Sequence, residues 1–413
     1  MSIQHAPSTP MGLARDDTQD PHAVWAVVGG TVGMALGFGC LALTSVFMQP
    51  LEQAFGWSRA DVSLGYAMAA AGMAVGGLIW GRLSDRLDIR LLLTIGGAGM
   101  VLSLLGMAAA QSLWHFYAAN LVLGGFGFAV LYAPLVSAPG EWFVRNRGLA
   151  IGIVTAGGAA GPGILPYVAS ILIRDVGWRQ AFLYLSIAVL VALLLTFPRL
   201  RRPDSVGVVA GAVVASEPLS AGERRGLAIL AVAAFMCCTC MGVPLVHLAS
   251  FVGGLCGSPE LGAASLLIAM LSGAVGRVCF GAIADRIGYV PSYALASVIQ
   301  TGCVLAYPLL GDAASLLTLS AVFGFGFSGN MTCLILCVRE TVAANRFGSA
   351  LGMVMLIAWA GMAAGGYAGG LLFDLFASYA LAFVLAGAAG GLNLMALLAL
   401  ARQRRGLRTA LAA

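Results

Sequence analysis

The chain has 413 residues, of which 60% are hydrophobic and 9% are charged, and its formal net charge is +5. A soluble globular domain carries about 25% charged residues, so this composition excludes soluble enzymes and nucleic-acid-binding domains. The apolar runs are long and do not alternate with polar residues, which favours membrane-spanning helices over a barrel. We therefore predict an all-α membrane protein embedded in the lipid bilayer.

The predicted elements follow a simple order along the chain. Residues 1–22 are polar and contain three prolines and three aspartates, so we expect a disordered cytoplasmic tail rather than a signal peptide. Twelve apolar spans follow, each near the length of about 20 residues that crosses a bilayer. They cover approximately 23–48, 60–81, 91–110, 114–139, 148–173, 180–198, 226–252, 261–284, 290–311, 314–338, 347–372 and 379–401.

The longest connection, 199–225, divides these spans into two sets of six. Its small apolar centre is too short to cross a membrane, so we predict a cytoplasmic linker. The expected organisation is a tail at 1–22, a six-helix bundle at 23–198, the linker, a second six-helix bundle at 226–401 and a tail at 402–413.

Arginine counting predicts the orientation. All 22 basic residues are arginine; 18 lie in segments on the side of the two termini, three lie on the opposite side, and Arg277 lies within a span. Cytoplasmic loops carry an excess of basic residues. We therefore expect both termini in the cytoplasm and, taking the absence of lysine as typical of a GC-rich bacterial genome, the inner membrane of a bacterium.

The two halves share sequence. The stretch GRLSDRLDIR begins at Gly81, and GAIADRIGYV begins 200 residues later at Gly281. The run GFGF occurs at 125–128 and at 324–327, and NRGLAIG at 146–152 is echoed by NRFGSALG at 345–352. Ordered matches at offsets of 199 or 200 residues indicate duplication of a six-helix unit, a known transporter plan. The glycine runs follow no strand, so we interpret them as helix-packing sites rather than nucleotide loops.

The stretch from Gly81 to Arg90 resembles the loop motif between the second and third helices of the major facilitator superfamily. The stretch EWFVRNRGLAIGIVTAGGAAG at 141–161 resembles a signature of monocarboxylate transporters, and oxalate/formate exchangers carry a related stretch. The resemblance implies two pseudo-symmetric six-helix bundles around a central site. It also implies that Arg277 binds substrate. The acid that animal relatives carry one turn before this arginine is replaced by Gly273.

Arg277 is the central candidate for binding. A lone arginine in a span costs about 3 kcal/mol on insertion scales. No acid lies deep in any span, so the expected partner is an anionic substrate, since guanidinium binds carboxylate through two parallel hydrogen bonds. The alternative is a structural bond to a backbone carbonyl. One deep cation favours a singly charged substrate, because a second buried negative charge would be unpaired.

Further residues are candidates for the same site. His247 is interpreted either as a substrate contact or proton relay, or as a satisfied histidine near the headgroups. Tyr132 and Asn330 follow the two GFGF runs and are candidate donors to a carboxylate; the alternative is hydrogen bonding between helices. Phe38, Ile153 and Trp359 are candidate apolar walls, against ordinary packing in the core or against lipid.

The repeated loop motifs supply candidate gating residues. Asp85, Arg86, Asp285 and Arg286 lie at predicted helix ends on the cytoplasmic side. An aspartate of such a loop is favoured when it lies against the N-terminus of a neighbouring helix. We therefore expect these residues to link helices and close the cytoplasmic side in one conformational state of the carrier. The alternative is that these residues lie in solvated turns and only reflect the excess of basic residues in cytoplasmic loops.

No catalytic constellation and no metal site is apparent, because the cysteine cluster at 237–240 has no histidine or acid nearby. We therefore expect neither an enzyme nor a cofactor, with a proton as the coupling ion. The predicted function is transport of a small organic monocarboxylate, lactate-like or pyruvate-like, by a functional monomer with proton symport. The alternative transport function is exchange of dicarboxylates or other organic anions. A membrane enzyme would need a catalytic motif, and a sensor would need a soluble output domain; neither is apparent in the sequence.

Overall fold

A computed structural model describes residues 21–83, 87–143, 147–200, 219–343 and 346–412. The described residues are almost entirely helical, with twelve helical segments long and apolar enough to cross a membrane. These twelve segments coincide with the twelve spans predicted from the sequence. The predicted tail at 1–22 and the linker at 199–225 lie mostly outside the described residues, so the predicted domain boundaries stay a prediction.

The helices of the N-terminal half make the first six crossings. They are α1 (Pro21–Ala42) continued by α2 (Thr44–Phe55), α3 (Arg59–Leu83), α4 (Ile89–Ala108), α5 (Leu113–Val122) continued by η2 (Leu123–Phe128) and α6 (Ala129–Trp142), α7 (Arg147–Val176), and α8 (Trp178–Thr196) with η3 (Phe197–Arg199).

The helices of the C-terminal half repeat this arrangement. They are α9 (Ala221–Cys256), α10 (Pro259–Ile287), α11 (Tyr289–Ala306) with η4 (Tyr307–Leu309), α12 (Ala313–Thr341), α13 (Phe347–Phe376) and α14 (Ala380–Ala412). Several helices extend beyond the predicted apolar span because local caps satisfy their polar ends. At α9, the Ser220 hydroxyl accepts from the Glu223 backbone and the Glu223 carboxylate accepts from Ser220, so the helix begins five residues before the apolar run.

Glycine pairs hold equivalent helices together in the two halves. A Cβ added to Gly124 would overlap the carbonyl oxygen of Ala69, and a Cβ added to Gly324 would overlap that of Ala269. Both pairs are related by an offset of 200 residues, the same offset that relates the loop motifs at Gly81 and Gly281. Small residues let membrane helices approach closely. The glycine runs therefore pack α5 and η2 against α3, and α12 against α10, in agreement with their interpretation as packing sites.

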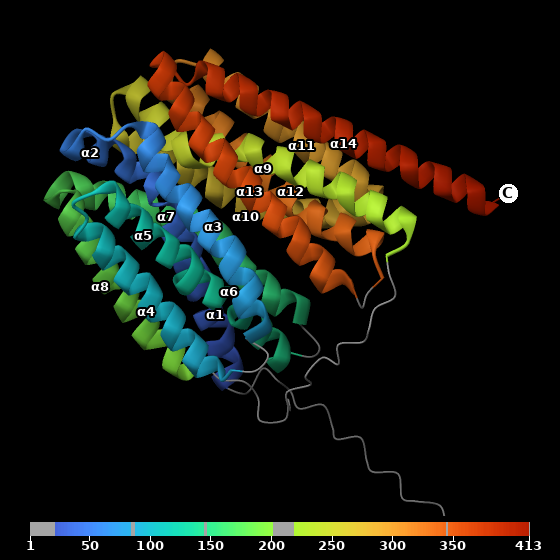
Figure 1. Cartoon of the computed structure of the whole chain (residues 1–413), viewed down its shortest axis with the longest axis horizontal. Helices are drawn as coiled ribbons and strands as arrows, with labels where there is room; N and C mark the ends of the chain where they lie inside the picture. The colour runs from blue at the N-terminus through green and yellow to red at the C-terminus, as the bar shows by residue number, and fades with distance from the viewer. Residues whose placement is uncertain (1–20, 84–86, 144–146, 201–218, 344–345, 413) are drawn as a thin grey trace, which may run out of the picture.

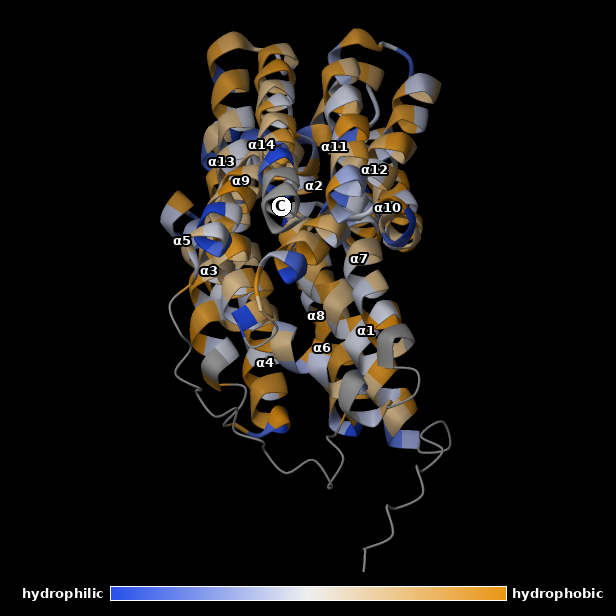
Figure 2. Ribbon diagram, turned by 90° about the vertical axis from the view of Figure 1, so that its right-hand side faces the viewer, coloured by the Kyte–Doolittle hydropathy of each residue, from blue (hydrophilic) through white to orange (hydrophobic). Residues whose placement is uncertain are grey.

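Each half has its own buried core. Phe47, Phe116 and Phe182 lie in the N-terminal core, and Tyr293 and Phe383 lie in the C-terminal core. Figure 2 shows hydrophobic residues along most of the length of the helices, as expected for a surface that faces lipid tails. We refer to the two halves as the N-bundle and the C-bundle.

The two bundles meet closely at one end. Short connections at 56–58, 109–112, 177, 257–258, 310–312 and 377–379 lie on the same face, here called the turn face. The opposite face, where α8 ends and α9 begins, is the linker face. Figure 1 shows the helices of the two bundles side by side near the turn face and diverging toward the linker face. Helix α3 packs against α13, and α7 packs against α10, across the boundary between the bundles.

Candidate functional site

Arg277 lies on α10 at the boundary between the bundles. Its Nη1 donates to the carbonyl oxygen of Thr155 on α7, in the other bundle, at 3.3 Å. Its Nε is buried and has no hydrogen-bond partner among the described residues. A buried donor without a partner costs about 1–3 kcal/mol, and more when the group is charged. The backbone-carbonyl partner that the sequence left open is therefore present, but it leaves the guanidinium partly unsatisfied.

Aromatic side chains from three helices form a cluster that includes Tyr132, a neighbour of Arg277. The Phe38 ring on α1 lies 6.3 Å from the ring of Tyr132 on α6 and 6.4 Å from that of Trp359 on α13. The Phe38 and Trp359 rings are nearly parallel, at 15°, and belong to different bundles. Tyr132 is 42% exposed and lies within electrostatic range of Arg277. The structure thus brings together four of the predicted site residues.

Ile153 has a less defined place. It lies on α7, two residues before Thr155, and 45% of its surface is exposed. No described side-chain contact joins it to the three rings or to Arg277. Its role as an apolar wall therefore stays a prediction.

His247 and Asn330 lie apart from Arg277, in two other networks. His247 on α9 is fully buried near the turn face, with Nε2 2.7 Å from the carbonyl oxygen of Gly366 and Nδ1 3.2 Å from the hydroxyl of Tyr379. It is a satisfied histidine in this conformation, and no described contact joins it to Arg277.

Asn330 is fully buried inside the C-bundle. Its Nδ2 donates to Oε1 of Gln300, and its Oδ1 accepts from the hydroxyl of Ser297, at 2.6 and 3.0 Å. Asn393 on α14 donates to the same hydroxyl. Asn330 therefore joins α12, α11 and α14, which corresponds to the interhelical alternative that the sequence left open for this residue.

The predicted gating residues are only partly described. Asp85 and Arg86 lie outside the described residues. Asp285 and Arg286 are exposed near the linker-face end of α10 and make no hydrogen bond or ion pair with another described residue. The gating role of these four residues therefore stays a prediction.

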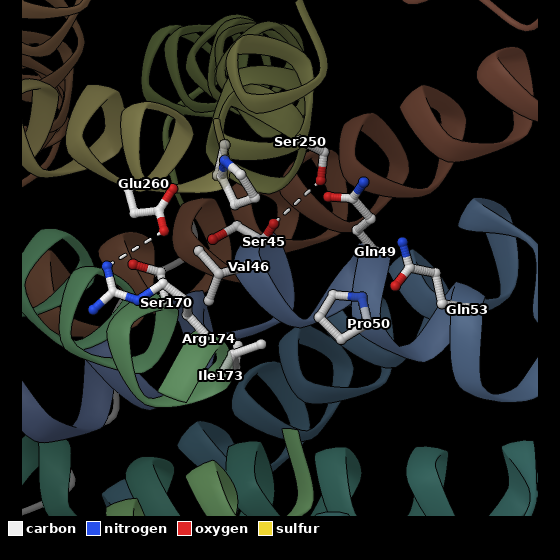
Figure 3. Close-up of a pocket in the computed structure, with 12 residues that line it drawn as sticks. Ser45, Val46, Gln49, Pro50, Gln53, Ser170, Ile173, Arg174, Ser250 and Glu260 are labelled. Atoms are coloured by element: carbon white, nitrogen blue, oxygen red, sulfur yellow. Dashed lines mark hydrogen bonds and ion pairs between the residues drawn. The ribbon is translucent and has the colours of Figure 1, made fainter. Parts of the chain in front are cut away.

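A cavity of about 250 Å³ lies between the bundles at the turn face (Figure 3). Its walls come from α2 and α7 on one side and α9 and α10 on the other. Arg174 forms a 3.5 Å ion pair with Glu260 across it, and the Ser250 hydroxyl donates to the Ser45 carbonyl oxygen at 3.3 Å. These contacts hold the turn face closed above the region of Arg277.

Sequence reasoning missed several residues that join the helices. Thr155 contributes a backbone carbonyl, which residue type does not reveal. Arg59, Asp374 and Tyr379 meet at the turn face although 320 residues separate Arg59 from Tyr379. A polar signal was present in each case, but only the fold shows which polar residues meet. Within the described part of the chain, histidine, cysteine and acidic residues form no group of three that would hold a metal ion.

Comparisons with known proteins give a consistent result. The family model of the Major Facilitator Superfamily matches residues 29–358. Monocarboxylate transporter 13 of Bos taurus is 29% identical over 366 residues, which cover 86% of this chain and 83% of the relative. Monocarboxylate transporter 11 of Homo sapiens is 28% identical over 382 residues, covering 88% and 80%.

A solved structure shares the fold. The crystal structure of a mutant of the nucleoside transporter NupG matches with a TM-score of 0.75 and 14% identity, over 92% of this chain and 99% of that chain. The relatives and the structure are named as transporters rather than enzymes. The predicted fold class and the predicted resemblance to monocarboxylate transporters are confirmed.

Proposed function

Since the chain belongs to the major facilitator superfamily, we propose that it carries a small organic monocarboxylate, lactate-like or pyruvate-like, by alternating access. The chain is a multi-pass membrane transporter, with twelve helical segments that suit a bilayer. The names of its monocarboxylate-transporter relatives support the substrate class.

The observation that carries this proposal is the unsatisfied guanidinium of Arg277. One nitrogen is held by Thr155 and positions the side chain, while the buried Nε has no partner among the described residues. A carboxylate would accept from this side of the guanidinium and supply the missing negative charge. Charge-assisted hydrogen bonds of this kind are roughly twice as strong as neutral ones. The resting contact with a carbonyl oxygen is weaker, so it can give way when substrate arrives.

The surroundings of Arg277 support one negative charge on the substrate. Arg277 interacts with Tyr132, whose ring adjoins that of Phe38, and the Phe38 ring adjoins that of Trp359; no second cation interacts with these rings among the described residues. The Tyr132 hydroxyl is able to donate to the second carboxylate oxygen, and the rings form apolar walls for the carbon skeleton. Asn330 and His247 have no part in this site in the conformation observed.

Phe38 and Tyr132 belong to the N-bundle, and Arg277 and Trp359 belong to the C-bundle, so a substrate bound here would touch both. The turn face is held closed, while the helices diverge toward the linker face (Figure 1). Rocking of one bundle against the other would expose the site to the opposite side, as alternating access requires. We place both termini in the cytoplasm of a bacterial inner membrane and expect a functional monomer coupled to protons.

Uptake into proteoliposomes tests the proposal. A panel of labelled monocarboxylates and dicarboxylates is offered with and without a pH gradient to the wild type, to Arg277→Gln and to Arg225→Gln. Gln keeps hydrogen-bonding groups but loses the charge, so Arg277→Gln should lower monocarboxylate uptake by roughly 10- to 100-fold, the worth of a charged hydrogen bond of about 1.5–3 kcal/mol. Arg225 is exposed at the start of α9, and its variant should transport like the wild type.

Normal carboxylate uptake by Arg277→Gln would overturn the binding role. Faster uptake of a dicarboxylate that depends on an exchangeable anion inside would support the exchanger alternative instead. Stimulation by an inward proton gradient would support symport, and its absence would refute it without affecting the role of Arg277.

A further inference from the structure

A cluster of side chains at the turn face joins the two bundles and has no part in the carboxylate site. The backbone N–H groups of Arg59 and Ala60, at the start of α3, donate to the two carboxylate oxygens of Asp374 on α13 at 3.0 and 2.7 Å. A helix N-terminus has unpaired N–H groups and a positive dipole end, so it stabilises a carboxylate. The C-bundle therefore holds the first turn of α3.

The side chain of Arg59 strengthens this connection. Its guanidinium lies over the Phe373 ring at 3.6 Å, its Nη1 donates to the Tyr379 hydroxyl at 2.8 Å, and its Nε pairs with Glu52 on α2 at 3.3 Å. The side chain is only 15% exposed. We name Arg59, Asp374, Tyr379 and His247 the turn-face latch, because Arg59 of the N-bundle is bonded to Asp374 and Tyr379 of the C-bundle, and Tyr379 is bonded to His247.

The hydrogen bonds of the latch run in one direction. The Gly366 carbonyl oxygen only accepts, so Nε2 of His247, 2.7 Å away, carries a hydrogen. In the neutral ring Nδ1 then accepts, and the Tyr379 hydroxyl donates to it across 3.2 Å. The same hydroxyl oxygen accepts from Arg59. Each donor from Arg59 through Tyr379 and His247 to Gly366 thus has one acceptor when His247 is neutral.

When Nδ1 of His247 binds a proton, it becomes a donor and no longer accepts from the Tyr379 hydroxyl. Two cationic donors would then point at one hydroxyl oxygen, and the Tyr379 hydrogen would turn to its other neighbour, the Met48 sulfur at 3.8 Å, a weak acceptor. The charged groups whose fields reach His247 are Arg59 on α3 and Asp374 on α13, and Glu52 on α2 is bonded to Arg59. Tyr66 of α3, beside Gly366, is the other titratable neighbour, while α10, α11, α12 and α14 direct no described charged group at His247.

We propose that His247 is a proton-binding site of this transporter and that proton binding there releases the turn-face latch. The proposal rests on the alternating access proposed above and goes beyond it by assigning the residue that binds the proton. His247 is fully buried while the latch is closed, so it exchanges protons with water when the turn face opens. With cytoplasmic termini the turn face is the outer face, and external acid would hold the carrier open to the outside.

The linkage between proton binding at His247 and opening of the turn face gives the size of the expected pH effect. A histidine in water titrates near pH 6.5, whereas in the closed latch a charged ring would face the Arg59 guanidinium across one hydroxyl oxygen and is disfavoured. Proton binding and closure therefore oppose one another reciprocally. Between pH 8 and pH 5.5 the ratio of open to closed molecules should rise about tenfold, since about ten protonated open molecules accompany each neutral one at pH 5.5.

A distance measurement across the turn face tests the proposal. Labels at Gln111 and Gly311, exposed on the turn face of the N-bundle and the C-bundle, are introduced as unnatural residues because the chain has nine native cysteines. Distance distributions are recorded by pulsed electron resonance in nanodiscs at pH 8 and pH 5.5 without substrate. The wild type should shift toward the longer distance in acid. His247→Gln should keep the shorter distance at both pH values, because its amide donates to Gly366 and accepts from Tyr379 without binding a proton.

Three results would overturn the proposal: no acid response in the wild type, an unchanged response in His247→Gln, or loss of the response in Asp374→Asn with its retention in His247→Gln. The last would assign the proton to Asp374. If His247→Gln does not fold, Tyr379→Phe decides, because it keeps the ring but removes the hydroxyl, and it should lower the closed fraction at pH 8 and flatten the pH response. No substrate is present, so these results do not depend on whether the cargo is a carboxylate.

Discussion

Buried polar residues of this chain differ in the partners that the fold gives them. Arg277, His247 and Asn330 were all candidates for one site because each places a polar group in an apolar span. Arg277 keeps an unpartnered nitrogen at the bundle boundary. His247 and Asn330 have their groups bonded within a network. Only Arg277 is prepared for a carboxylate, since a buried donor without a partner gains most from an acceptor.

The network around Asn330 should matter for stability rather than for transport. Asn330→Leu would remove the amide that donates to Oε1 of Gln300 and the acceptor of the Ser297 hydroxyl hydrogen, at a cost of about 1–2 kcal/mol. Thermal unfolding of the purified protein in detergent should show a lower midpoint, with uptake per folded molecule little changed. Ser328→Ala is a matched control, because the buried Ser328 hydroxyl on the same helix has no described partner. An Asn330→Leu variant as stable as the wild type would contradict this role.

At the scale of elements, close helix approach at the bundle boundary depends on glycine. Gly370 on α13 lies against the start of α3, where an added Cβ would come within 2.6 Å of the Arg59 carbonyl oxygen and would also meet the Ser63 hydroxyl. The contact lies beside Asp374, which accepts from the first turn of α3. Close packing and hydrogen bonding therefore depend on each other at this crossing. A side chain at Gly370 would push α13 away from α3 and would also disrupt the hydrogen bonds to Asp374.

Gly370→Ala should open the turn face. The added methyl group meets backbone, which cannot yield as a flexible side chain does, so the two helices must separate by a few tenths of an ångström or more. We expect a larger population with the long distance between labels at Gln111 and Gly311 at pH 8. Gly391→Ala adds the same methyl group on α14, where nothing lies within 4 Å, and should leave the distances unchanged. Equal distance distributions for the two variants would show that α3 and α13 accommodate the methyl group without separating, and would contradict this prediction.

At the scale of the whole molecule, contacts of unequal strength hold the two bundles together. In the turn-face latch the Arg59 side chain is 15% exposed and two backbone N–H groups donate to Asp374, whereas the side chains of the Arg174–Glu260 pair are 56% and 38% exposed. Exposed ion pairs contribute about 0–1 kcal/mol and are screened by salt. The latch rather than this ion pair should therefore determine the fraction of molecules in which the turn face is closed.

Removing the exposed pair tests this ranking. Arg174→Ala should raise the ratio of open to closed molecules at low salt by less than about fivefold, the equivalent of 1 kcal/mol, and the effect should vanish at high salt. Asp374→Asn should have a larger effect that survives in salt, because its carboxylate accepts two short hydrogen bonds from backbone N–H groups rather than pairing with a mobile side chain. The two variants are compared with the same pair of labels at two salt concentrations. A larger effect of Arg174→Ala at high salt would reverse the ranking.

The sequence by itself determined the membrane class, the twelve crossings, the duplication and the single deep cation. Each is a property of local composition or of a repeat: apolar runs of bilayer length must become helices, because lipid offers the backbone no hydrogen bonds. The arginine at 277 was identifiable because its insertion is costly wherever it points.

The tertiary structure alone decided which polar groups meet. Asn330 bonds to Gln300 rather than facing the site, and His247 bonds to Tyr379, 132 residues away in sequence. Helical periodicity gives the face of a helix but not its neighbour, and the rotation of each helix is set by packing against others. Carbonyl groups such as that of Thr155 are common to every residue, so the contact that holds Arg277 carries no signal in the sequence.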